Sequence, residues 1–349
     1  MKKKIVSALL CVAMIATMAT GCGGSKSSST SGNADSTAKQ FEINAAIAAN
    51  PPALDPHTVN ANVTGAIGIH IYEALFQMDE NYEPQPVLAE SYEMSDDGKE
   101  YTIKLRQGVK FHNGDEMKAD DVVASMNRWM ELSPKAKTLI GGSVFEKVDD
   151  YTVKLTVNEP SSDIIMVLAS PIQFAAIYPK SVVDSASDEG VKEYIGTGPY
   201  KVAEWKQDQY VKLEKNEDYQ PAEGKSSGLA GAKNAQADTI TFNIVTDTAT
   251  RIAGVQNGQY DIAEDIPADQ YKDLAADKNL TMDVRSGGTL NLFLNTTEGV
   301  MADEKVRQAA LAALNCDDIL MASYGDADLY KLNAGWCNPD DAQWGTEAG

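Results

Sequence analysis

The sequence is poor in the residues from which metal centres and hydrolytic sites are built. Its 349 residues include four cysteines and three histidines, His57, His70 and His112. No C-x-x-C pair, Cys/His cluster or H-E-x-x-H spacing occurs, which argues against a zinc site. A hydrolase needs a nucleophile held against a base, and three histidines offer few bases. We therefore expect no enzymatic activity, no metal and no cofactor, and a structural role for His112.

Basic residues are also scarce. Lys and Arg together number 30 against 51 Asp and Glu, which gives a formal net charge of −21. Nucleic acids and anionic lipid surfaces are bound by basic faces. The composition therefore argues against nucleic acid as a partner and fits an exported domain that stays in solution.

Long apolar runs are absent except near the N-terminus. Three lysines at residues 2–4 precede a mostly apolar stretch from Ile5 to Ala19. This stretch is short and rich in Ala and Thr for a membrane-spanning helix. A basic start followed by a short apolar region is the pattern of a secretory signal peptide, which we predict at residues 1–21.

Small residues lead directly into a cysteine at Ala19-Thr20-Gly21-Cys22. This ending resembles the lipobox of bacterial lipoproteins, whose cysteine receives a diacylglycerol and becomes the new N-terminus. The resemblance implies a lipid anchor at Cys22 on the outer face of the cytoplasmic membrane, on the extracellular or periplasmic side. Two acyl chains suffice for a stable anchor. The alternative is ordinary signal cleavage, with Cys22 incidental.

Residues 22–40 are dominated by Ser, Gly, Thr and Ala without apolar periodicity, which predicts a flexible tether. The S-x-x-K pattern at residues 36–39 falls in this tether, and we interpret it as a chance match. Of the other cysteines, Cys316 and Cys337 could form a disulfide outside the cell. One buried and one exposed free thiol is the equal alternative.

From Phe41 onward the sequence alternates between strand and helix periods, which predicts a mixed α/β fold. A turn at residues 95–98 has the Asp-Gly chemistry of a hairpin. Apolar stripes at helical spacing, each opened by acidic residues, predict helices over 120–130 and 306–314. The first stripe contains Met126, Trp129 and Met130, which we expect in the core. Alternating residues predict strands at 101–105, 151–157, 210–213 and 240–244.

Four segments in order resemble family 5 of the bacterial extracellular solute-binding proteins, the peptide/nickel-binding family of ABC importers. The first pairs Pro52-Ala53-Leu54-Asp55-Pro56 with Ile71-Tyr72-Glu73-Ala74-Leu75. The second runs from Leu88-Ala89-Glu90-Ser91-Tyr92 through Leu105-Arg106-Gln107-Gly108-Val109 and Phe111-His112-Asn113-Gly114 to Ala119-Asp120-Asp121-Val122. The third is Gly196-Thr197-Gly198-Pro199-Tyr200-Lys201, and the fourth joins Asn295-Thr296 to Val306-Arg307-Gln308-Ala309. Together these segments cover nearly all of residues 50–315.

The resemblance implies an α/β, two-lobe periplasmic-binding-protein-like fold of type II, similar to cluster C, with an extra α+β subdomain. Lobe one would take residues 41–80 plus 196–285, and the extra subdomain residues 81–195. Lobe two would begin at residue 286. Because domains commonly need about 100 residues or more, we expect lobe two, at residues 286–349, to be incomplete through truncation.

The function implied by the resemblance is capture of di- or oligopeptides in an interlobe cleft and delivery to the permease subunits of an ABC transporter. Such a protein is expected to be a monomer. Nickel or metallophore binding is the alternative within the family. A secreted hydrolase and a surface receptor that does not transport are the alternatives from other classes.

Candidate ligand contacts can be placed only at the expected edges of the cleft. Asn50, His57 and Thr58 surround the Leu54-Asp55-Pro56 motif. Gly287, Gly288 and Thr289 lie where the chain would cross into lobe two. Loop residues often carry binding contacts, but an ordinary turn role is the alternative for each of the six.

Overall fold

The structure is a computed structural model that describes residues 40–187, 189–284, 288 and 290–332. The signal peptide predicted at 1–21, Cys22 and nearly all of the tether therefore lie outside the described residues. The same holds for Gly287, Thr289 and Cys337. The chain divides into residues 1–39 and the unit from Gln40 onward, and only the second of these is described below.

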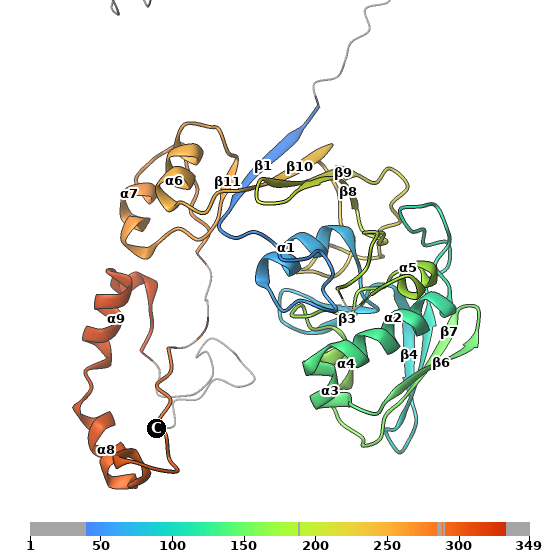
Figure 1. The fold of residues 1–349 in the computed structure, drawn as a ribbon, viewed down its shortest axis with the longest axis horizontal. Helices are drawn as coiled ribbons and strands as arrows, with labels where there is room; N and C mark the ends of the chain where they lie inside the picture. Colours follow the sequence, from blue (N-terminus) through green and yellow to red (C-terminus); the bar gives the residue numbers. More distant parts are fainter. Residues whose placement is uncertain (1–39, 188, 285–287, 289, 333–349) are drawn as a thin grey trace, which may run out of the picture. The chain divides into compact units, whose positions relative to one another are not determined.

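Within that unit, the described residues form a five-stranded sheet in the order β11-β1-β10-β9-β8 (Figure 1). β1 runs parallel to β10 and β11, whereas β9 is antiparallel to both of its neighbours. The strands predicted at 210–213 and 240–244 are thus confirmed. The strand bounds are β1 (Glu42–Ile47), β8 (Tyr200–Lys206), β9 (Tyr210–Lys215), β10 (Thr239–Ile244) and β11 (Ile262–Ala263).

A four-stranded antiparallel sheet has the order β4-β5-β7-β6. The alternation in β5 buries Tyr101, Ile103 and Leu105 on one face. The predicted hairpin turn precedes β5, with Gly98 at a positive φ of 69°. The bounds are β4 (Ala89–Met94), β5 (Glu100–Leu105), β6 (Val144–Asp149) and β7 (Thr152–Thr156), and a small hairpin joins β2 (Phe76–Met78) to β3 (Pro84–Pro86).

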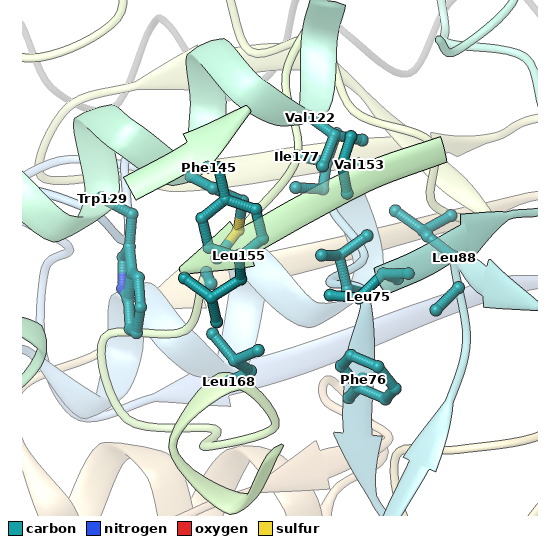
Figure 2. Close-up of a cluster of buried hydrophobic side chains, with 14 of the residues drawn as sticks. Leu75, Phe76, Leu88, Val122, Trp129, Phe145, Val153, Leu155, Leu168 and Ile177 are labelled. Carbon is teal, nitrogen blue, oxygen red and sulfur yellow. The ribbon is translucent and has the colours of Figure 1, made fainter. Parts of the chain in front are cut away.

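Helix α2 (Ala119–Leu132) packs against β6 and β7 of this sheet. Its apolar stripe buries Val122, Met126 and Trp129 completely, as expected for a core face. Figure 2 shows Phe145, Leu155 and Leu168 lying together in the same cluster as Trp129. The neighbouring helices are α3 (Pro134–Ile140), α4 (Ile164–Leu168) and α5 (Lys180–Asp184).

The remaining described helices are α1 (Asn62–Ile71), α6 (Thr248–Gln256), α7 (Tyr271–Ala275), α8 (Glu304–Ala313) and α9 (Cys316–Tyr324). Short 3₁₀ turns occupy Ala268–Gln270, Val300–Ala302 and Ala327–Leu329. α8 confirms the helix predicted over 306–314, although neither α8 nor α9 buries a residue. No helix among the described residues is both long and apolar enough to cross a membrane.

Candidate functional site

A groove of about 250 Å³ lies beside the start of α1. One wall is the start of α1 and the chain that enters it, including Val59, Asn60 and Asn62. The other wall is the turn after α4, residues 171–173, which we call the 171–173 loop. Every residue that lines the groove is uncharged. Such a surface can hold the backbone and the neutral side chains of a solute.

The first turn of α1 presents free backbone donors beside this groove. Its N-cap position is Ala61, and no side chain caps the helix or adds acidic charge to its first turn. The first N–H groups of a helix lack partners within the helix, and the helix dipole makes this end positive. A carboxylate or carbonyl oxygen of a solute is the chemistry that this end accommodates.

Small residues keep the groove open along α1. Gly65 and Ala66 line it, and a Cβ on Gly65 would lie 3.8 Å from the Pro171 carbonyl oxygen. Thr64 anchors the first turn of the helix, because its buried hydroxyl donates to the Ala53 carbonyl oxygen at 2.6 Å. The helix start is therefore tied to the Pro-rich segment that precedes it.

Behind the groove, Asp55 and Arg128 form a buried ion pair. Their side chains are 1% and 10% exposed. The two Arg128 nitrogens donate to the two Asp55 oxygens at 3.3 and 2.7 Å, a bidentate geometry. The Tyr178 hydroxyl and the Val191 amide also donate to this carboxylate. Burial raises the Asp55 pKa, but the Arg128 hydrogen bond, the nearby His57 and Arg128 charges and the Tyr178 hydrogen bond together outweigh it, so that the pKa lies below its ordinary value.

His57 belongs to the same buried cluster. Its ring is fully buried, and burial lowers its pKa to about 4 despite the nearby Asp55 charge. The neutral ring fits its partners: Nε2 lies 2.9 Å from the Ala176 carbonyl oxygen, which can only accept, and Nδ1 lies 3.0 Å from an Arg128 nitrogen, which can only donate. The cluster thus joins residues 55–57 to α2 and to the chain near residue 176.

The Gly196-Thr197-Gly198 motif is explained by close backbone packing. A Cβ on Gly196 would lie 2.2 Å from the Ile71 carbonyl oxygen, and one on Gly198 would lie 2.5 Å from that of His70. His112 secures the motif: its Nε2 lies 3.0 Å from the Gly198 carbonyl oxygen and its Nδ1 accepts from the Gly196 amide at 3.2 Å. Burial lowers the His112 pKa to about 4. These contacts bear out its structural role.

The four predicted ligand contacts that the structure describes lie in different environments. Thr58 stands between the lining residues Pro56 and Val59, but its hydroxyl donates to the Asp55 carbonyl oxygen. Asn50 does not line the groove, and its amide donates to Asp208 at 2.8 Å. The His57 ring has no exposed surface with which to touch a solute in this structure. Gly288 is exposed, whereas its two predicted neighbours are outside the described residues.

Sequence reasoning did not identify the residues that line the groove. An uncapped helix start at Asn62 is a local signal that could have indicated one wall. No local pattern indicated the 171–173 loop, because the contacts that place it come from α2 and the chain that follows it.

Three further expectations bear on chemistry. Among the described residues, no group of three or more His, Cys, Asp or Glu side chains could hold a metal ion. Residues 224–228 spell the serine-hydrolase pattern G-x-S-x-G, which the sequence analysis overlooked. They lie in the loop between β9 and β10, and not on the strand-to-helix turn that this pattern requires. Cys316 is exposed, and its proposed pairing with Cys337 stays a prediction.

A family model described as "Bacterial extracellular solute-binding proteins, family 5 Middle" matches residues 83–336. The chain belongs to this family. The resemblance noted in the sequence is confirmed, and so is the periplasmic-binding-protein fold class. This is a family of substrate-binding proteins of ABC transporters and not of enzymes.

Among curated relatives, the glutathione-binding protein GsiB of Salmonella paratyphi A is 34% identical over 288 residues, which cover 81% of this chain and 54% of the relative. The chain therefore spans about half the length of the curated relatives it matches. Among solved structures, DppA from Helicobacter pylori with the peptide STSA has a TM-score of 0.66 and 26% identity, covering 82% of this chain and 59% of that one. AgaA from A. tumefaciens R10 with agropinic acid has a TM-score of 0.58 and 29% identity, covering 68% and 46%.

Proposed function

We propose that this family 5 solute-binding chain captures peptides and passes them to the permease subunits of an ABC transporter. The observation that carries the proposal is the uncharged groove at the uncapped start of α1. Extended peptides are commonly held through their backbone, with pockets for side chains. A helix start that offers N–H groups suits a peptide carbonyl or carboxylate.

The similar proteins support this chemistry without fixing the ligand. DppA from Helicobacter pylori was solved with a tetrapeptide, and GsiB is named for glutathione, itself a tripeptide. AgaA was solved with agropinic acid, so the same fold also holds a solute of another class. We place peptides first because an uncharged wall suits a repeating amide backbone.

The proposed setting is the outer face of the cytoplasmic membrane, with the chain anchored through diacylglycerol on Cys22 and working as a monomer. Residues 41–80 and 196–285 would form lobe one, 81–195 the extra subdomain, and 286 onward part of lobe two. Ligand contacts made only in a closed state would shift the lobes toward closure. Micromolar affinity, about −8 kcal/mol, is ample for such a shift and still allows release.

Calorimetric titration of the purified chain with STSA, glutathione and agropinic acid tests the proposal. Ala66→Phe places a ring in the groove, and it should weaken peptide binding by about tenfold or more, which corresponds to about 1.4 kcal/mol. Ala275→Phe is the matched control, because Ala275 is an exposed helical alanine that does not line the groove. Binding of agropinic acid alone, or equal binding by both variants, would contradict peptide capture in this groove.

A further inference from the structure

The 171–173 loop combines exposure with an unfavourable backbone. Ile172 is 55% exposed although it is a large apolar residue that lines the groove. Gln173 adopts a positive φ of 48°, in the left-handed region that residues other than glycine avoid. Such conformations persist only where the surroundings enforce them, and they cluster at functional sites.

Three contacts from outside the loop enforce this conformation. The Trp129 indole nitrogen donates to the Gln173 carbonyl oxygen at 2.6 Å. The Ser133 hydroxyl donates to the Gln173 side-chain oxygen at 3.2 Å. Trp129 and Ser133 are themselves fully buried, so the parts that hold the loop belong to the packed core.

A third connection reaches Ile172. The Lys135 ammonium donates to the Ser170 hydroxyl, and that hydroxyl donates to the Ile172 carbonyl oxygen at 3.4 Å. Ser133 and Lys135 lie at the corner between α2 and α3, and Trp129 lies in the last turn of α2. One rigid corner therefore fixes the carbonyl groups of both residues, 172 and 173.

We propose that the 171–173 loop is the specificity-determining wall of the groove, and that it selects peptides with an uncharged side chain at the position facing Ile172. This rests on the proposed peptide binding. A charged side chain packed against this wall would lose water and find no charged partner among the lining residues. Trp129 and Ser133 act as positioning residues, because they hold the wall without lining the groove.

The test uses calorimetric titration with STSA and with peptides in which each residue in turn is Leu, Asp or Lys. At one position, wild type should bind the Leu peptide at least about tenfold more tightly than the Asp and Lys peptides. Ile172→Lys should make the Asp peptide about tenfold better than the Lys peptide at that position alone. Ile262→Lys is the matched control, since Ile262 is equally exposed, at 53%, and does not line the groove.

The positioning role has its own readout. Trp129→Phe removes the indole donor, and it should lower the Leu-to-Asp affinity ratio several-fold in a variant shown by thermal unfolding to be folded. Gln173→Gly removes the side chain that Ser133 holds and frees the backbone of the loop, so it should also lower the ratio. If wild type binds no peptide, the proposed function fails. If it binds peptides but Ile172→Lys leaves the Asp-to-Lys ratio unchanged at every position, the specificity wall is refuted and peptide binding stands.

Discussion

The buried pair of Asp55 and Arg128 gives the sharpest prediction about stability. In Arg128→Met the carboxylate of Asp55, 1% exposed, would keep its place without its bidentate partner. His57 would also lose the donor to its Nδ1. Removing one member of a buried ion pair costs about 3–5 kcal/mol, because the remaining charge is left uncompensated.

The assay is thermal and urea unfolding of the chain at neutral pH. A loss of about 4 kcal/mol should lower the Tm by ~6 °C, because an unfolding entropy of about 2.1 cal/mol/K per residue gives ~1.5 °C per kcal/mol for ~300 folded residues. Lys180→Met is the matched control, because the Lys180–Asp184 pair is 51% and 58% exposed and worth ~0.5 kcal/mol or less. Met and Lys have similar helix propensities.

A double variant separates lost charge from lost packing. Asp55→Asn in the Arg128→Met background removes the orphaned charge, so the double variant should be more stable than the sum of the two single losses. The reasoning would be refuted if Arg128→Met cost no more than Lys180→Met, or if the two single losses simply added.

Other predictions concern the close backbone packing at Gly196 and the buried histidines. Gly196→Ala should cost about 3 kcal/mol or more in urea unfolding, since its Cβ would meet the Ile71 carbonyl oxygen at 2.2 Å. Gly108→Ala, with φ of 74° and open space around it, should cost only ~1–2 kcal/mol, and equal losses would contradict the packing argument. His57 and His112 have folded pKa values of about 4 against 6.5, so the unfolded chain binds more protons between these values. The free energy of unfolding should therefore be highest above about pH 6.5, where both states leave the histidines neutral. It should fall by ~3 kcal/mol per histidine as the pH drops to 4. His112→Gln should reduce the slope of the unfolding free energy against pH by the contribution of one proton. An unchanged slope would contradict the lowered pKa of His112.

The sequence predicted the elements whose patterns are local. β5 follows from the alternation of Tyr101, Ile103 and Leu105, and α2 from a stripe whose members meet on one helix face. Such periodicities depend on residues a few positions apart, so they can be seen without knowledge of the fold.

The candidate site depends on contacts between distant residues, and these could not be predicted. Asp55 lies in a motif that the sequence analysis noted, yet its partner Arg128 is 73 residues away. The groove wall at Gln173 is held by Trp129 from 44 residues away. The interpretation of Trp129 as a core residue is confirmed, but its indole N–H also fixes a loop beside the groove. No spacing rule encodes such a pairing.

The central claim, that this family 5 chain carries peptides in its groove, is tested most directly by native mass spectrometry of the protein extracted from its own membranes. The account predicts a spread of small bound masses that fragment into amino-acid residues, and their loss in Ala66→Phe but not in Ala275→Phe. A single bound mass that yields no amino-acid fragments, or peptide masses retained equally by both variants, would contradict it.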